Sequence, residues 1–240
     1  MSEFEGKVVL VTGGGSGIGR ATAIAFAQEG AKVSILDVDK KGAEETRKLT
    51  SAGLVVVGDV SKSADCKRAV SEVVKTFKRL DILVNNAGVE CQFTPVEKAS
   101  EEDWNRVMGI DLTGVFLMSK HAIPHLSDGG AIVNLSSSLG FQPSEQLAPY
   151  CAAKAGVIML TRVMALELAP RIRVNCICPG PIDTPLLRRF TTPKELGRIT
   201  ASQPLRRLGK PEEVADAILF LCSRRASYIT GAVLSVGAQI

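Results

Sequence analysis

Short runs rich in β-branched residues alternate along this chain with longer amphipathic stretches, and this alternation restricts the fold more than any other feature. Seven runs predict strands: Val8 to Thr12, Lys32 to Asp37, Val55 to Val60, Ile82 to Asn85, Ala131 to Ser136, Arg173 to Ile177 and Val233 to Val236. Five stretches predict helices: Gly17 to Glu29, Ser63 to Phe77, Ser100 to Leu126, Ala148 to Leu168 and Pro211 to Leu221. Because helices separate strands that are apolar throughout, we expect an α/β fold with one doubly wound parallel sheet of about seven strands and helices on both faces.

Composition places this fold in a small range of protein classes. With 240 residues, 45% of them hydrophobic, the chain is long enough for one full core, so we expect a single domain over residues 1–240. The net charge of +4 is mild, and no dense basic stripe interleaved with aromatics predicts nucleic-acid binding. The first residues lack the pattern of a secretory signal, and no apolar run is long enough for a membrane span. We therefore expect a cytoplasmic protein.

Cysteine and histidine spacing gives no sign of a metal or redox centre. The six cysteines are scattered, and the nearest pair, Cys176 and Cys178, has one intervening residue where redox motifs have two. His121 and His125 have a spacing that binds metal from one helix face, but Pro124 lies between them and no third ligand is evident. We expect reduced core thiols and no metal.

A glycine-rich turn, Thr12 to Gly19 (TGGGSGIG), joins the first predicted strand to the first predicted helix. Glycines allow a pyrophosphate to approach the backbone closely, and the helix N-terminus offers amide donors. Asp37 ends the second predicted strand, where a carboxylate can accept both hydroxyls of an adenosine ribose and would repel a 2′-phosphate. The pattern predicts NAD rather than NADP; the alternative is that Asp37 is an ordinary carboxylate at a strand end.

Tyr150 and Lys154 stand four residues apart in a predicted helix, so both side chains lie on one face. A phenol alone is a poor base at neutral pH, whereas a neighbouring ammonium lowers its pKa by favouring the phenolate. Ser137 precedes this pair, and its hydroxyl can orient a carbonyl or alcohol oxygen for proton transfer. The three residues predict hydride-transfer chemistry with Tyr150 as general acid and base.

These motifs together resemble the short-chain dehydrogenase/reductase family over nearly the whole chain. The matching residues are Thr12 to Gly19, Asp59 and Val60, Asn85 to Gly88, Ser137, Tyr150 with Lys154, and Pro179 with Gly180. The resemblance implies a seven-stranded Rossmann sheet, a nicotinamide cofactor, no metal in the chemistry, and a homotetramer. It implies that the cofactor contacts Gly13, Ser16, Gly17, Ile18, Gly19, Asp37, Asp59, Val60, Asn86, Ala87, Gly88, Tyr150, Lys154, Pro179, Gly180, Ile182 and Thr184.

One position departs from the family pattern. Where relatives usually carry asparagine in the long central helix, this chain has Asp111. The family asparagine supports a water that relays protons to the lysine, so we expect Asp111 to belong to the catalytic group with Ser137, Tyr150 and Lys154. A charged Asp111 would oppose the field that favours the Tyr150 phenolate, and it would lower activity at neutral pH.

The segment over residues 184–210 is expected to form a substrate lid. It carries Glu195 and a set of basic residues: Arg188, Arg189, Lys194, Arg198, Arg206, Arg207 and Lys210. This excess of positive charge favours an anionic ligand, and the alternative is a solvated basic surface.

Three functions follow from these residues. The first is an NAD-dependent oxidoreductase that interconverts a small-molecule secondary alcohol and a ketone. The second is a 3-oxoacyl-(acyl-carrier-protein) reductase of fatty-acid synthesis, which the basic lid favours and Asp37 disfavours. The third is a non-catalytic NAD-binding sensor or scaffold, which Asp111 alone favours.

Overall fold

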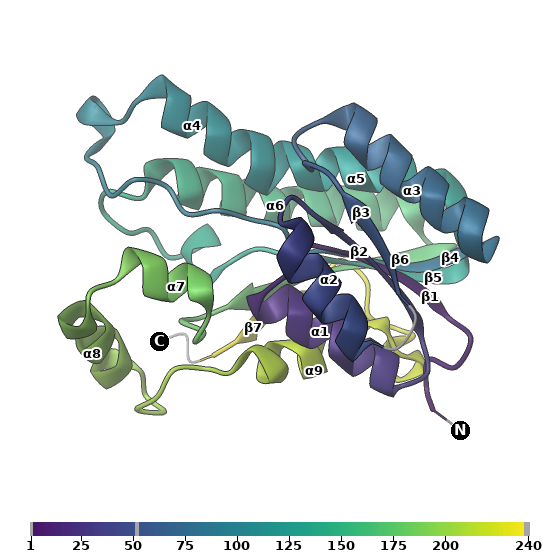
Figure 1. The fold of residues 1–240 in the computed structure, drawn as a ribbon. Coiled ribbons are helices and arrows are strands. Elements are labelled where there is room, and N and C mark those ends of the chain that lie inside the picture. Colours follow the sequence, from purple (N-terminus) through teal and green to yellow (C-terminus); the bar gives the residue numbers. More distant parts are fainter. Residues whose placement is uncertain (1, 51–52, 238–240) are drawn as a thin grey trace.

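A computed structural model describes residues 2–50 and 53–237, and it shows a twisted parallel sheet between two layers of helices (Figure 1). The sheet has seven strands in the order β3-β2-β1-β4-β5-β6-β7, and every neighbouring pair is parallel. The strands are β1 (Val8–Thr12), β2 (Lys32–Asp37), β3 (Leu54–Val57), β4 (Leu80–Asn85), β5 (Leu126–Leu135), β6 (Ile172–Pro179) and β7 (Val233–Val236). The predicted doubly wound Rossmann-type sheet is confirmed.

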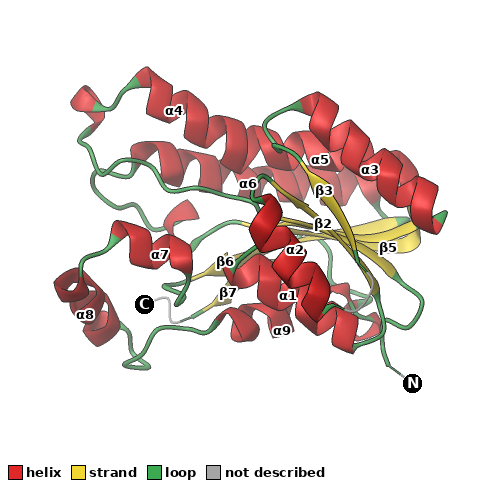
Figure 2. Cartoon of the chain, viewed as in Figure 1, coloured by secondary structure: helices red, strands yellow, loops and turns green. Residues whose placement is uncertain are grey.

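Helices cover both faces of the sheet (Figure 2). One face packs against α1 (Gly17–Gln28), α2 (Lys40–Leu49) and α9 (Pro211–Cys222). The other packs against α3 (Ser63–Phe77), α5 (Gly114–Ala122) and α6 (Ala148–Leu168), with α4 (Glu101–Met108) beside α6. Two short helices, α7 (Pro185–Phe190) and α8 (Pro193–Ser202), lie beyond the end of β6.

Strand β4 shows why these strands are apolar at every position. Ile82 and Val84 belong to the core under α1 and α9, whereas Leu83 belongs to the core under α3 and α5. Successive side chains of a strand point to opposite faces, and here both faces are removed from water. Burial of each such aliphatic side chain contributes about 1.5–3 kcal/mol to stability.

The strand order reverses between β1 and β4, and this is the point where such sheets bind ligands. The two carboxyl ends are tied together by Thr12, whose Oγ1 accepts hydrogen bonds from the amides of Asn86 and Ala87, both at 3.0 Å. The Asn86 side chain returns a bond of 3.0 Å to the carbonyl oxygen of Gly13. The glycine turn and the turn after β4 therefore form one rigid unit.

The single helix predicted over Ser100 to Leu126 is wrong. Ser100 caps α4 as its serine suggests, but a π-helical turn, η2 (Gly109–Thr113), separates α4 from α5. After α5 a 3₁₀ turn, η3 (Ile123–His125), ends the helical segment, because Pro124 lacks the amide that an α-helix needs. The widened π turn carries Asp111, and such turns often occur at functional sites.

Other element boundaries also differ from prediction. Strand β3 ends at Val57 rather than Val60, because residues 58–60 turn toward the ligand-binding edge. Strand β5 begins five residues earlier than expected, at Leu126, with an irregular register opposite Leu80 and Ile82. Helices α2, α7 and α8 were not predicted, since their sequences are mostly polar or short.

Candidate active site

A cavity of about 1000 Å³ runs along the carboxyl edge of the sheet, from the glycine turn to α8. It gathers the predicted site residues from distant parts of the chain, namely Gly13, Ser16, Gly17, Ile18, Asp37, Asp59, Val60, Asn86, Ala87, Gly88, Asp111, Ser137, Tyr150, Lys154, Pro179, Gly180, Ile182 and Thr184. Gly19 alone among the predicted residues does not line the cavity, because it packs behind the turn. The roles of these residues remain predictions; their convergence is a structural observation.

The glycine turn requires glycine for two different reasons. Gly13 and Gly17 have φ values of 65° and 50°, in the left-handed region that other residues rarely adopt. Gly19 has no such backbone, but a Cβ there would collide with the carbonyl oxygen of Gly13 and the amide of Asn86. Ser16 precedes α1 without capping it through its side chain, so the first amides of the helix remain free for a ligand.

Asp37 is held at the edge of the cavity by two backbone amides. Its carboxylate accepts a hydrogen bond from Gly15 N at 2.8 Å and another from Asp39 N at 2.9 Å. Arg20, which follows the glycine turn, is engaged by Glu45 at 3.1 Å and by the hydroxyl of Thr46 at 3.0 Å. The Arg20 guanidinium is thus engaged by α2 and by the Gly15 carbonyl, and Asp37 presents a carboxylate at this end of the cavity.

The three predicted reactive side chains come from two elements. Tyr150 and Lys154 lie one turn apart on α6 and are buried, and the Lys154 ammonium is 5.4 Å from the centre of the Tyr150 ring. Ser137 follows β5 and accepts a hydrogen bond from Leu139 N at 3.2 Å, which fixes its hydroxyl beside Tyr150. The hydroxyl of its neighbour Ser136 instead donates a hydrogen bond of 2.7 Å to the carbonyl oxygen of Lys154, so Ser136 supports the backbone of α6.

Asp111 forms a buried ion pair with the lysine. Its Oδ2 lies 3.0 Å from Lys154 Nζ without the alignment of a hydrogen bond, and its Oδ1 accepts from Val89 N at 2.8 Å. Burial raises the pKa of Asp111, and Lys154 opposes that rise. Burial alone would lower the pKa of Lys154, but the charges of Asp111 and Tyr150 outweigh it and raise that pKa. The lysine therefore stays cationic throughout the physiological range.

The environment of Tyr150 departs from the expectation that its pKa is lowered. Burial raises the pKa of this phenol, and the carboxyls of Glu90 and Asp111 raise it further. Lys154 lowers the pKa, as predicted, and so does the hydrogen bond with Ser137, but together they do not outweigh burial and the two carboxyls. The sequence identified Lys154 as the cation beside Tyr150. It could not show that burial has the larger effect on the pKa of Tyr150.

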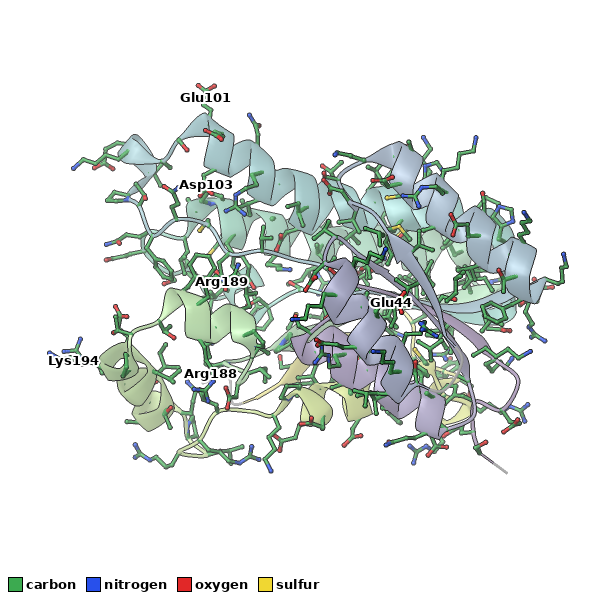
Figure 3. The ribbon with its side chains drawn as sticks, viewed as in Figure 1. Glu44, Glu101, Asp103, Arg188, Arg189 and Lys194 are labelled. Atoms are coloured by element: carbon green, nitrogen blue, oxygen red, sulfur yellow. The ribbon has the colours of Figure 1, made fainter. Side chains whose placement is uncertain are left out.

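The basic excess of residues 184–210 is smaller in the fold than in the sequence. Arg188 pairs with Asp183 at 2.6 Å, and Arg207 pairs with Glu213 at 2.5 Å, so acids outside this segment neutralise two of its cations. Figure 3 shows Arg188 and Arg189 on α7, and Lys194 pointing away from the molecule on α8. Arg198 is the basic residue of α8 that lines the cavity.

The sequence placed residues 184–210 over the substrate but did not reveal the helix α8 or all of its lining residues. The helix brings Glu195, Arg198, Ile199 and Ser202 to the cavity wall, and Gln203 follows directly after it. A signal for it existed: Thr192, Pro193 and Glu195 form a capping box with proline in the first turn. Phe93 and Leu147 also line the cavity and carry no motif that sequence alone reveals.

His121 has a hydrogen-bonding neighbour and five of the six cysteines are buried, whereas His125 is exposed. His121 Nε2 lies 2.9 Å from the hydroxyl of Ser63, and all six cysteines are free thiols. Over residues 2–50 and 53–237, no cluster of three or more His, Cys, Asp or Glu side chains is arranged to hold a metal ion. Within the same residues, no helix combines the length and apolar character that crossing a membrane requires.

The sequence and the fold have counterparts among known proteins. A family model described as enoyl-(acyl carrier protein) reductase matches residues 13–238. The chain belongs to the short-chain dehydrogenase/reductase family. It is therefore an oxidoreductase, and members of this family bind a nicotinamide cofactor.

Relatives in this family differ in what they act on. The chain is 42% identical over 242 residues to a 3-oxoacyl-(acyl-carrier-protein) reductase of Thermotoga maritima, covering 97% of each. It is 38% identical over 247 residues to 2-(S)-hydroxypropyl-CoM dehydrogenase 3 of Xanthobacter autotrophicus, covering 98% of this chain and 96% of that one. Levodione reductase has a similar structure, with a TM-score of 0.93 at 35% identity, covering 98% of this chain and 97% of that one. A 3-ketoacyl-(acyl-carrier-protein) reductase from Brucella melitensis, complexed with NADH, gives 0.91 at 41% identity, with 97% of each covered.

Proposed function

We propose that the protein is an NAD-dependent dehydrogenase that interconverts a secondary alcohol and a ketone. The observation that carries this proposal is the convergence of Ser137, Tyr150 and Lys154 on the wall of the cavity that begins at the glycine turn. In the oxidative direction Tyr150 takes the proton of the substrate hydroxyl. Ser137 holds the substrate oxygen, and the Lys154 ammonium stabilises the negative charge that develops on the phenol oxygen.

The cavity fits a nicotinamide dinucleotide. Its volume, the left-handed glycines and the uncapped amides of α1 suit a pyrophosphate, and Asp37 suits a ribose with both hydroxyls free. The residues that would hold the cofactor are those predicted from the sequence, with Asp59 and Val60 at the adenine and Pro179 to Thr184 at the nicotinamide. When bound, the nicotinamide supplies the hydride acceptor.

The position of Asp37 predicts the choice between the two nicotinamide cofactors. We expect NAD to bind at least about tenfold more tightly than NADP, a difference of about 1.4 kcal/mol, because the carboxylate repels a 2′-phosphate. Fluorescence titration of the two cofactors measures this ratio directly. Equal affinities would refute the role given to Asp37.

Asp111 predicts a specific pH dependence. Its negative charge raises the pKa of Tyr150, so the Asp111→Asn variant should have a lower Tyr150 pKa. Alcohol oxidation rises with pH as the phenol loses its proton, and the rising limb should therefore move to lower pH, with several-fold higher activity near neutrality. Asp128→Asn is the control, because it removes the same charge from an exposed position. Identical pH-rate profiles for the parent and Asp111→Asn would rule out this role.

A second candidate function is reduction of 3-oxoacyl groups on an acyl carrier protein. It is favoured by Arg198 on the cavity wall and by the names of two relatives, and Asp37 disfavours it. A non-catalytic sensor of NAD rests on Asp111 alone. To test the proposed function, NADH formation should be followed across secondary alcohols, sugars, hydroxy acids and 3-hydroxyacyl thioesters. Turnover that is confined to the thioesters supports the reductase, and NAD binding without any turnover supports the sensor.

We also propose that residues 184–210 form a lid over the substrate, since α7 and α8 line one end of the cavity. A cytoplasmic location is consistent with six free thiols, which oxidising compartments tend to pair. We also propose that residues 1–240 form a single domain.

We further propose a homotetramer that uses an exposed apolar stripe on α6. Met159, Val163 and Leu166 follow helical spacing and are 57%, 42% and 85% exposed, and Phe116 of α5 is 46% exposed. Light scattering should report a tetramer for the parent, and a smaller species for Met159→Glu combined with Leu166→Glu. Val96→Glu, at another exposed apolar site, is the control. A monomeric parent would contradict the assembly.

A further inference from the structure

Glu90 is a carboxyl on the cavity wall that the proposed chemistry does not use. It follows the turn after β4, is half-buried and lines the cavity close to Lys154, Asp111 and Tyr150. Within the described part of the chain, its carboxyl oxygens have no hydrogen-bond donor or salt-bridge partner at bonding distance. The carboxyl is half-buried on the cavity wall, where the hydroxyl of a ligand can replace water as its hydrogen-bond donor.

The backbone around Glu90 is fixed from several sides. Val89 N donates to Asp111 at 2.8 Å, the Glu90 carbonyl accepts from the Arg106 guanidinium at 2.6 Å, and Gln92 N donates to Asp103 at 2.8 Å. Asp103 and Arg106 are themselves paired at 2.6 Å, and Figure 3 shows Asp103 on the inner side of α4 while Glu101 points outward. Such a loop presents its side chain in a pre-organised position, as ligand recognition requires.

The charges near Glu90 restrict the ligand it can accept. Burial raises the pKa of Glu90 to about 7; Lys154 opposes the rise and Asp111 adds to it. Near neutral pH the carboxyl can therefore accept a hydrogen bond from a hydroxyl when it is ionised, and can donate or accept one when it is protonated. An anionic group beside it would be repelled by the carboxyls of Glu90 and Asp111. A cationic group would be repelled by the ammonium of Lys154. An uncharged hydroxyl can donate a hydrogen bond to Glu90 without being repelled by any of these three groups.

We propose that Glu90 is a specificity-determining residue that selects an uncharged substrate with a second hydroxyl group next to the alcohol that is oxidised. Vicinal diols, polyols and sugars have this chemistry. Ser138, Ser144 and Gln146 line the same cavity and offer further hydrogen-bonding groups to a polyhydroxylated molecule. The inference rests on the proposed dehydrogenase function, because it requires an alcohol in this cavity.

The test compares vicinal diols with their monohydroxy analogues in matched cyclic and open-chain pairs. The cyclic pair is trans-1,2-cyclohexanediol and cyclohexanol. For the parent, kcat/KM should favour the diol by at least about tenfold, as expected when a hydrogen bond to a charged group is lost. Glu90→Leu should bring the two values close together, while Glu90→Gln retains part of the preference through its amide oxygen. Glu97→Gln, on the exposed surface nearby, should keep the full preference. Titration with NAD and thermal melting establish that each variant is folded.

The outcomes separate this inference from the function on which it rests. Oxidation of diol and monohydroxy alcohol with equal kcat/KM would overturn the role of Glu90 and leave the dehydrogenase intact. A diol preference that survives in Glu90→Leu would also overturn the role of Glu90 and leave the dehydrogenase function intact. Higher activity on β-hydroxybutyrate or on an amino alcohol than on the diols would overturn selection for an uncharged hydroxyl. If the parent oxidises no alcohol of any pair while binding NAD, the proposed function fails and the inference fails with it.

Discussion

Replacing Tyr150 with phenylalanine is expected to lower kcat for alcohol oxidation by about 10²–10⁴-fold, the usual contribution of a general acid and base. The substitution removes one oxygen atom from a buried ring and changes neither its shape nor its packing in α6. Cofactor affinity should therefore stay within about twofold of the parent, since the glycine turn and Asp37 are untouched. Steady-state kinetics and a titration with NAD measure the two quantities separately.

The chain provides its own control for this substitution. Tyr228 is the other tyrosine; it is fully exposed and does not line the cavity. Tyr228→Phe should be indistinguishable from the parent in kcat, KM and cofactor affinity. If Tyr150→Phe retained more than about a tenth of parental kcat, Tyr150 would not be the group that moves the proton.

The second large effect is expected at Gly19. In Gly19→Ala the new Cβ meets the backbone of Gly13 and the side-chain amide of Asn86, and the Gly13 backbone leaves little room to relax. We expect NAD affinity to fall at least about a hundredfold. Overpacking of this kind destabilises a folded protein by about 1–3 kcal/mol or more. Isothermal titration of NAD and chemical denaturation measure the two effects.

Gly197 is the matched control, because it lies in the middle of α8 with no atom within 4 Å of a Cβ placed there. Gly197→Ala should leave NAD affinity unchanged and should raise helix stability slightly, by up to about 1 kcal/mol. Unchanged NAD affinity in Gly19→Ala would mean that the glycine turn serves packing alone, and the cofactor site would have to be sought elsewhere.

The sequence predicted those parts of the site that depend on local spacing. Tyr150 and Lys154 share a face because a helix repeats every 3.6 residues, and this follows from their positions alone. Asp37 ends a strand whose neighbour in the sheet carries the glycine turn, so their proximity follows from the parallel order. For the same reason the sheet could be predicted in outline, while the end of β3 differed because the chain turns toward the cavity there.

The features of the site that the sequence did not predict depend on how burial, charges and helix geometry combine in three dimensions. The π turn that brings Asp111 to Lys154 leaves the apolar spacing of the surrounding helix nearly unchanged, and so it has no clear pattern in the sequence. The raised pKa of Tyr150 results from burial and two carboxyls, which together outweigh one cation and one hydrogen bond, and no spacing rule weighs these effects. The neutralisation of Arg188 and Arg207 by Asp183 and Glu213 likewise required the fold.

The central claim is hydride transfer from a substrate carbon to the cofactor, with Tyr150 taking the hydroxyl proton. The most direct measurement uses the alcohol that the parent oxidises fastest, with deuterium in place of hydrogen on the carbinol carbon, and determines the mass of the reduced cofactor. We predict that one deuterium appears in the reduced cofactor and none in the solvent, and that Tyr150→Phe forms this product at least about a hundredfold more slowly. Deuterium released to water, or no reduced cofactor from any alcohol that the protein binds together with NAD, would contradict the account.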